Sequence, residues 1–210
     1  MALVEEAMEL VRAVRKDGGP DSYNKWASKY DELIGTKLNY IGFNSVLSKW
    51  SQYCSQDIPE GRRPRILDAG CGTGLLGQQV NTVVSLDNVE LYGGDYSPGM
   101  LEEAKQKGIY QDLKVIDLKA ELPYEEGFFD SIVSSGVFSK SHCGPSCLPN
   151  LIRVLKKGGY FITTVKKDLY TLTEKEWEKV IDECNCKLIE MPDMPYHNES
   201  SALVFVIKKN

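Results

Sequence analysis

The sequence has no uninterrupted apolar run near the roughly 18 residues that a membrane-spanning helix needs. Its opening stretch, "MALVEEAMELVRAVRK", carries three glutamates inside the apolar pattern, which is atypical of a secretory signal. Basic residues are not in excess: the formal net charge is −5, whereas proteins that bind nucleic acid by neutralising phosphates usually have a basic face. We therefore expect a cytoplasmic protein that binds neither membranes nor nucleic acid.

Histidine is scarce, since His142 and His197 are the two histidines of the chain. A zinc site built on the Cys143–Cys147 or Cys184–Cys186 spacing would need further cysteine or histidine ligands, and few remain. Without an export signal the six cysteines should stay thiols. We expect neither disulfides nor a bound metal.

The length of 210 residues and the 42% hydrophobic content fit one α/β domain covering residues 1–210. Residues 1–60 should be helical. Apolar spacing predicts a first helix over residues 3–14, a second that is capped by Asp21 or Ser22, and a third over residues 43–53. Residues 61–210 should form the core that binds a cofactor.

From residue 61 the chain alternates short apolar runs with helical stretches, which is typical of a parallel sheet built from βαβ units. A helix capped by Thr173 and two strands, "KLIEMP" and "ALVFVIKK", come last. Because only a short stretch that contains "YHNESS" separates these two strands, they should be antiparallel neighbours. The prediction is a Rossmann-like, doubly wound seven-stranded sheet. Its first five strands are expected at Arg65–Asp68, Glu90–Asp95, Leu113–Asp117, Phe129–Ser134 and Tyr160–Val165.

The stretch "RILDAGCGTGLLG", residues 65–77, places a glycine-rich turn directly after the first strand. From Gly72 it matches G-x-G-x-x-G, which favours a dinucleotide. From Asp68 it matches D-x-G-x-G-x-G, which resembles the first motif of the S-adenosylmethionine-dependent methyltransferases. Either ligand needs bare backbone and the N–H groups of a helix N-terminus here. The acidic Asp68 disfavours a pyrophosphate and suits the ammonium of S-adenosylmethionine.

Motifs beyond the glycine loop decide between the two possibilities. "VIDLKAELPYEEGFFDSIVSSGVF" and "LIRVLKKGGYFITT" resemble, in order and spacing, the later motifs of class I methyltransferases. "YNKWASKYDELI" and "GVFSKSHCGPSCLPNLIRVLKKGG" are similar to the methyltransferase-like proteins of the Williams–Beuren chromosomal region. The resemblance covers the chain from about Tyr23 onward. Differences from that family are Asn24, Lys157 and a lysine-rich stretch before His142.

This resemblance implies S-adenosylmethionine as the cofactor and a set of residues that bind it. Asp95, at the end of the second strand, would accept both ribose hydroxyls. Asp117 and the backbone N–H of Leu118 would hold the adenine. Gly77 would pack a helix, so Gly77→Ala should be far milder than a valine at Gly70 or Gly72. The full set of expected cofactor-binding residues is Tyr23, Trp26, Tyr30, Gly70, Gly72, Asp95, Tyr96, Met100, Asp117, Leu118 and Ser135.

Two features concern the methyl acceptor. The helix with Tyr23, Trp26 and Tyr30 is expected to form a lid over the methionine end of the cofactor, with Tyr30 or Tyr23 bonding its carboxylate; the same spacing equally predicts core packing. His142, in the loop after the fourth strand, could act as a catalytic general base, whereas transfer to a neutral amine would need alignment alone. A solvated edge is predicted for Lys156, Lys157, Lys166 and Lys167.

We therefore expect a monomer that transfers a methyl group by direct in-line displacement to a nitrogen or oxygen of a small molecule. The "SSGV" after the fourth strand differs from the N-P-P-Y-type motif of enzymes that methylate nucleic-acid amines, which favours a small acceptor. Two alternatives come from other classes. One is a dinucleotide oxidoreductase, and the other is a protein that binds S-adenosylmethionine without catalysis.

Overall fold

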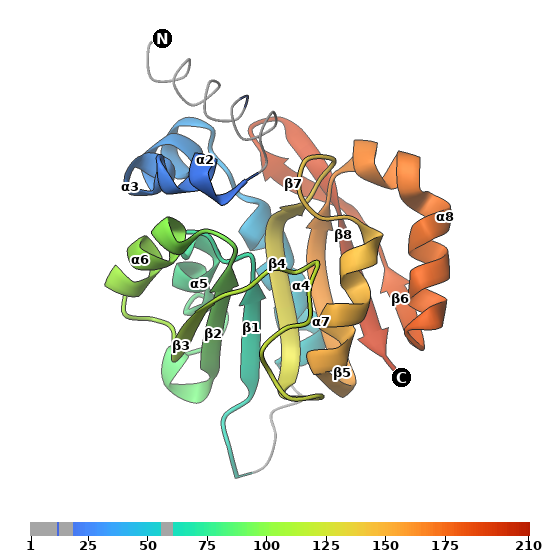
Figure 1. Cartoon of the computed structure of the whole chain (residues 1–210). Helices are drawn as coiled ribbons and strands as arrows, with labels where there is room; N and C mark the ends of the chain where they lie inside the picture. The colour runs from blue at the N-terminus through green and yellow to red at the C-terminus, as the bar shows by residue number, and fades with distance from the viewer. Residues whose placement is uncertain (1–11, 13–18, 56–60) are drawn as a thin grey trace.

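The computed structural model describes residue 12, residues 19–55 and residues 61–210 (Figure 1). The helix expected over residues 3–14 lies outside the described residues, apart from Arg12. The strands are β1 (Arg65–Ala69), β2 (Glu90–Asp95), β3 (Asp112–Val115), β4 (Phe129–Phe138), β5 (Leu155–Val165), β6 (Cys186–Glu190), β7 (Asp193–His197) and β8 (Ser200–Lys209). The helices are α2 (Pro20–Asn24), α3 (Ala27–Tyr30), the π-helix η1 (Asp31–Lys37), α4 (Gly42–Cys54), α5 (Leu75–Val80), α6 (Pro98–Gln106), α7 (Leu148–Val154) and α8 (Lys167–Glu183), with short 3-10 turns η2 (Leu86–Asn88) and η3 (Pro145–Cys147).

The strands form one sheet in the order β3-β2-β1-β4-β5-β8-β6, and β7 also pairs with β8. Strands β1 to β5 are parallel, and β8 runs antiparallel to β5, β6 and β7. The predicted doubly wound sheet with an antiparallel end is therefore confirmed. Strand β7 was not predicted. It pairs with the same edge of β8 as β6 does, after a short break in the chain. Pro192 precedes β7 and Pro195 lies within it, so the sequence shows no regular strand pattern there.

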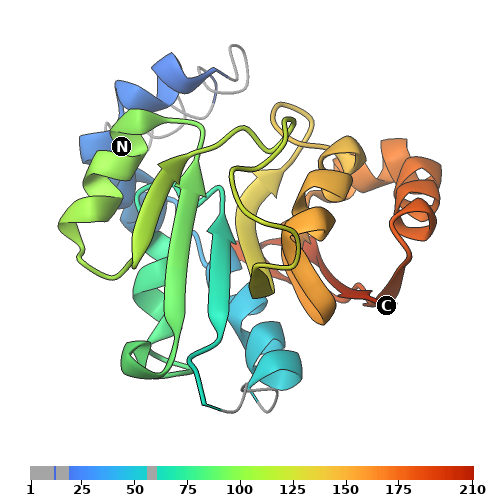
Figure 2. The ribbon, with the colours of Figure 1, turned by 60° about the horizontal axis from the view of Figure 1, so that its bottom comes forward.

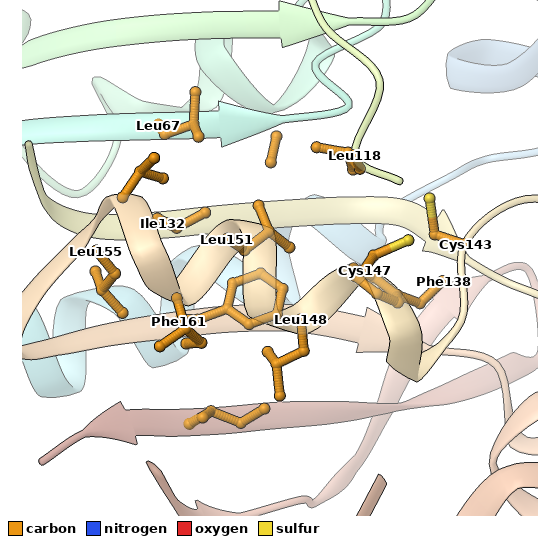
Figure 3. Close-up of a cluster of buried hydrophobic side chains, with 14 of the residues drawn as sticks. Leu67, Leu118, Ile132, Phe138, Cys143, Cys147, Leu148, Leu151, Leu155 and Phe161 are labelled. Atoms are coloured by element: carbon orange, nitrogen blue, oxygen red, sulfur yellow. The ribbon is translucent and has the colours of Figure 1, made fainter. Parts of the chain in front are cut away.

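Helices cover both faces of the sheet, which explains why consecutive residues of its central strands are buried, as at 66–69 in β1 and 131–134 in β4. Figures 1 and 2 show α7 on one face and α4 on the other. Beneath α7 and α8, a buried cluster joins Leu151 and Trp177 to Phe161 and Phe205 of the sheet. Figure 3 shows part of this cluster, with Leu151 over Ile132. On the opposite face Trp50 of α4 donates its indole N–H to Ser131 Oγ at 2.8 Å.

Several helix boundaries differ from the prediction. The second helix begins at Pro20, with Gly19 at its N-cap and no side-chain cap, so the expected cap by Asp21 or Ser22 is wrong. Proline has a fixed φ that suits the first helical turn. The last helix begins at Lys167, and Thr173 lies at a kink inside it, where its hydroxyl donates to the Leu169 carbonyl at 2.9 Å.

The expected lid helix is a chain of short segments. It passes from α2 through α3 into the π-helix η1. Figure 1 shows α2 and α3 above α6, beyond the carboxyl ends of the parallel strands. Asn24 fixes this position, because its Oδ1 accepts from Ser97 Oγ at 2.7 Å and from the Gly99 N–H at 2.8 Å. An aspartate could make the same two contacts, which explains why asparagine is tolerated here. Within the described ranges, no helix has the length and apolar character needed to span a membrane.

Candidate active site

A cavity of about 820 Å³ opens at the carboxyl ends of the parallel strands, the edge at which open α/β sheets bind ligands. Its walls come from the lid segment, the glycine loop, the ends of β2 and β4, the loop after β4, the start of α8 and the end of β7. His142 and ten of the eleven expected cofactor-binding residues line it. These ten are Tyr23, Tyr30, Gly70, Gly72, Asp95, Tyr96, Met100, Asp117, Leu118 and Ser135.

Trp26 is the expected residue that does not line the cavity. Its indole packs against the buried pair Leu33 and Ile34, so the structure places it in the core of the lid segment. The helical spacing predicted this packing and the cofactor contact equally. Because α2 ends at Asn24, Trp26 lies at the junction with α3, and it packs against the same pair as Tyr23 and Tyr30 without lining the cavity.

The glycine loop leaves bare backbone facing the cavity. Gly72 has a φ of +55°, and a Cβ built there would meet no other atom within 4 Å, so a larger side chain would enter the cavity. Gly70 has a φ of +74°, and a Cβ there would collide with the side chain of Val137. L-residues with side chains rarely adopt such φ values. Both positions therefore require glycine, and Gly72 does so for the shape of the cavity itself.

Asp95 ties the glycine loop to the end of β2. Its carboxylate accepts from the N–H of Gly72 at 2.8 Å and from the N–H of Ser97 at 2.9 Å. Burial raises the pKa of Asp95, while these backbone donors oppose that shift. An ionised carboxylate offers about four acceptor sites. Asp95 can thus hold the loop and still accept from a diol placed in the cavity.

Asp68, at the end of β1, is 1% exposed and also lines the cavity. Burial, opposed by a hydrogen bond from the Tyr110 hydroxyl at 2.7 Å and assisted by the nearby Asp95, raises the pKa of this carboxyl to about 7. A carboxyl that titrates near neutrality responds strongly to any cation beside it. Asp68 therefore suits a ligand ammonium, which would favour its ionised form.

Gly77 packs in α5 beneath this acid. A Cβ on Gly77 would lie 2.7 Å from Tyr110 Cζ and would collide with the hydroxyl that bonds Asp68. Gly77 is thus a packing glycine, as expected. The expectation that Gly77→Ala is far milder than changes in the loop needs revision, because this methyl group would displace the partner of a cavity carboxyl.

Apolar side chains form a second wall between the ends of β2 and β3. Met100 and Leu118 are buried there, and Tyr96 is 51% exposed at the rim. Asp117 lies in the turn after β3, outside the strand expected to contain it, and its Oδ1 accepts from the Lys119 N–H at 2.9 Å. This wall suits a flat heteroaromatic ring with a polar edge toward Asp117.

His142 meets the lid. Its Nε2 lies 2.8 Å from the Tyr23 hydroxyl, and its Nδ1 lies 2.7 Å from Ser139 Oγ. Burial raises the pKa of Tyr23 far above its usual value, so the phenol stays protonated and can donate to Nε2. In that tautomer the Nδ1–H donates to Ser139. The two contacts fix the ring in the cavity wall with a basic nitrogen beside the lid.

The lid is also tied to the glycine loop by a residue that sequence reasoning did not select. Asp31, at the start of η1, accepts from the Thr73 hydroxyl and from Lys107 Nζ, the latter at 2.6 Å. It is the aspartate of the "KYD" in the entry motif, so the motif resemblance carried the signal without stating its role.

The far end of the cavity was also missed. Tyr40 donates to or accepts from Ser135 Oγ at 2.6 Å, and its ring meets the ring of Tyr196 edge-on, with centroids 4.9 Å apart. Lys166 Nζ lies 3.8 Å from the Tyr196 ring centroid and lines the cavity. The prediction that Lys166 belongs to a solvated edge is therefore wrong; Lys156, Lys157 and Lys167 are exposed as expected. Pairing of β7 with β8 brings Tyr196 here.

The six cysteines are thiols in the structure. Across residue 12 and residues 19–55 and 61–210, no group of three or more histidine, cysteine or acidic side chains is arranged to hold a metal ion.

Comparisons with known proteins agree with this geometry. Residues 67–163 match the family model described as a methyltransferase domain. Human methyltransferase-like protein 27 is 34% identical over 156 residues, which are 73% of this chain and 60% of that protein. Demethylmenaquinone methyltransferase of Symbiobacterium thermophilum is 32% identical over 134 residues, 59% of this chain and 53% of that protein. The chain thus spans between half and two thirds of the length of these two relatives.

Solved structures show the same fold. A putative class I S-adenosylmethionine-dependent methyltransferase from Listeria monocytogenes aligns with a TM-score of 0.66 and 16% identity, over 93% of this chain and 70% of that one. An S-adenosylmethionine-dependent methyltransferase from Aquifex aeolicus aligns with a TM-score of 0.63 and 16% identity, over 91% and 98% of the two chains. With the cofactor motifs, these findings show that the chain has the fold of the class I S-adenosylmethionine-dependent methyltransferases and is similar to the methyltransferase-domain family over residues 67–163 and to human methyltransferase-like protein 27.

Proposed function

We propose that this chain binds S-adenosylmethionine in the cavity at the carboxyl ends of β1 to β3 and catalyses transfer of its methyl group to a small molecule. One observation carries the proposal. The open backbone of Gly72, the carboxylate of Asp95 and the apolar wall around Met100 converge on one cavity, although they come from three separate turns.

The residues fit the parts of this cofactor one by one. Asp68 would hold the ammonium, Asp95 the ribose hydroxyls, and Met100 with Leu118 the adenine ring beside Asp117. A dinucleotide fits less well, because its pyrophosphate would lie beside the buried acids Asp68 and Asp95. When bound, S-adenosylmethionine supplies a methyl group on a positively charged sulfur, which an acceptor atom displaces in line.

The lid residues would exclude water and align the acceptor. Tyr23 and Tyr30 close the cavity from above, and the contacts of Asp31 hold them to the glycine loop. A dry cavity strengthens electrostatic interactions and favours direct attack. Because the Tyr23 hydroxyl donates to His142 Nε2, an acceptor hydroxyl would pass its proton to the Tyr23 oxygen as the new bond forms, while Tyr23 passes its own proton to Nε2 of the ring that Ser139 orients.

The cavity and the charge of the chain support a small acceptor. The cofactor would fill only part of a space of about 820 Å³, and the lid covers it. The net charge of −5 does not favour a nucleic-acid surface. Relatives carry names of both kinds: demethylmenaquinone methyltransferases, and a bovine 18S rRNA (guanine-N(7))-methyltransferase that is 34% identical over 77 residues.

The test is transfer of a labelled methyl group from the cofactor to a panel of small phenols, carboxylic acids and amines. We expect turnover on at least one class. On a hydroxyl acceptor, His142→Gln should lower kcat by about 100-fold, in the range of general-base catalysis, while affinity for S-adenosylhomocysteine stays within about twofold. On an amine acceptor the same variant should change kcat little.

Two outcomes contradict this account. Binding of S-adenosylmethionine without turnover on any member of the panel would favour a non-catalytic binding protein. Transfer to RNA in preference to every small molecule would contradict the acceptor class.

A further inference from the structure

The cavity continues past the cofactor site toward the second half of the sheet. The cofactor residues follow β1, β2 and β3, whereas Lys166 follows β5 and both Tyr196 and His197 end β7. In the sheet order, β4 separates these two groups. A molecule that receives the methyl group must occupy this far end, so its lining residues select the acceptor. This inference rests on the proposed function.

Lys166 is held in a defined place at the far end. Its backbone N–H donates to the Phe138 carbonyl at 3.0 Å at the start of α8. Its ammonium lies 3.8 Å from the ring centroid of Tyr196 and 3.5 Å from His197 Nε2. The Tyr196 ring is fixed in turn by the edge-on contact with Tyr40, and the Tyr196 carbonyl accepts from the Ile41 N–H at 2.8 Å. The cation is therefore positioned before any ligand arrives.

The two ends of the cavity differ in charge. Asp68, Asp95 and Asp117 line the cofactor end together with one lysine, Lys119, and the three acids suit an ammonium, a diol and an amine. Among the described charged residues at the far end, two are lysines, Lys140 and Lys166, and one is an acid, Asp168. Lys140 and Asp168 form an ion pair at 3.3 Å and are about half exposed. The formal charge of the far end is thus positive, and Lys166 is its more buried cation.

Apolar and aromatic side chains continue the cavity wall beyond Tyr196. Tyr40 meets the Tyr196 ring, Phe43 meets the Tyr40 ring, and Ile34 and Leu38 line the same cavity. A ligand that matches the far end therefore has a flat or apolar body and one negative group.

We propose that the methyl acceptor is a small carboxylic acid with an apolar body, and that Lys166, positioned by His197 and Tyr196, binds its carboxylate. A charged hydrogen bond to an ammonium in a partly buried site gives a carboxylate a clear preference over a neutral amide of the same shape. Lys166 is then a specificity-determining residue. It selects the acid and leaves binding of the cofactor to the other end of the cavity.

The test compares acids with their amides on protein saturated with S-adenosylhomocysteine. Calorimetry would measure binding of benzoate, 4-hydroxybenzoate, phenylacetate and hexanoate, each against its own amide. In the wild type we expect at least one acid to bind about tenfold more tightly than its amide, as one charged hydrogen bond provides. Lys166→Met should abolish that preference. Lys167→Met is the matched control, because Lys167 is exposed, pairs with Asp193 and does not line the cavity.

The outcomes separate this inference from the proposed function. If S-adenosylhomocysteine binds all three proteins equally but no acid binds better than its amide, the carboxylate site is wrong and the cofactor site stands. The same conclusion follows if Lys166→Met keeps the preference. If S-adenosylhomocysteine does not bind the wild type, the proposed function itself fails.

Discussion

At the scale of single residues, Gly72 and Asp95 define the cofactor site together. The Gly72 N–H reaches the Asp95 carboxylate at 2.8 Å, so the loop after β1 and the end of β2 form one rigid unit. Gly72 has a positive φ, and a Cβ atom added to it would lie in empty space in the cavity. Glycine therefore keeps open the volume that a ligand would fill, and the carboxylate beside it supplies the polar contact.

This arrangement predicts a selective effect of Gly72→Val. The valine side chain would occupy the cavity, so affinity for S-adenosylhomocysteine should fall at least about 100-fold, roughly 2.7 kcal/mol. The control is Gly158→Val, because Gly158 also has a positive φ, of +80°, and also has no atom within 4 Å of its Cβ position, but it is exposed and outside the cavity. Calorimetry should show normal binding by the control. Equal losses in both variants would mean that backbone strain, and not blocked space, causes the effect.

Asp68 predicts a pH dependence of cofactor binding. In the free protein burial raises the pKa of Asp68 to about 7, so below that pH the carboxyl holds a proton. A bound ammonium favours the ionised form, and binding at low pH must therefore release the proton. Affinity for S-adenosylhomocysteine should rise between pH 6 and pH 7 and level off above, by up to about tenfold in all.

Asp68→Asn should flatten this profile and weaken binding at pH 8. Calorimetry at pH 6, 7 and 8 with both proteins makes the comparison. An unchanged profile in the variant would assign the titration to a group other than Asp68.

At the scale of elements, the lid depends on a few polar contacts between segments. Asp31 joins η1 to both the glycine loop and the end of α6, and Asn24 joins α2 to the start of α6. The lid is therefore held to parts that also form the cofactor site. A well-ordered lid should therefore favour a well-ordered cofactor site, and a well-ordered cofactor site should favour a well-ordered lid.

Asp31→Ala should loosen the lid and weaken binding of S-adenosylhomocysteine about fivefold, roughly 1 kcal/mol for partly exposed charged contacts. Hydrogen exchange of amides over residues 20–37 should become faster. Asp21→Ala provides the control, because Asp21 lies in the same segment on its exposed side. Indistinguishable results for the two variants would show that the Asp31 contacts do not hold the lid.

Elements with regular apolar patterns could be predicted from the sequence, and those with irregular backbone could not. Parallel strands β1, β2 and β4 begin at the predicted residues because each contains a short apolar segment between polar or glycine residues. Strand β7 contains Pro195, and proline within a short run normally argues against a strand. The division of the lid into α2, α3 and a π-helix leaves no periodic signal, since the apolar spacing fits one continuous helix.

At the scale of the whole molecule, the sequence could predict much of the proposed cofactor end of the cavity because Gly70, Gly72, Asp95 and Asp117 lie at or just after the ends of predicted strands. The far end depends on contacts between distant parts of the chain. Tyr40 and Tyr196 meet through the pairing of β7 with β8, and Lys166 faces the cavity because α8 begins at Lys167. Neither contact has a local pattern, which is why the lysine was assigned to a solvated edge.

The central claim is that the glycine loop holds S-adenosylmethionine and not a dinucleotide. Calorimetry of the purified chain with S-adenosylhomocysteine and with NAD, in parallel titrations, tests it most directly. The account predicts saturable binding of S-adenosylhomocysteine at one site and no binding of NAD. Tight binding of NAD without binding of S-adenosylhomocysteine would contradict it.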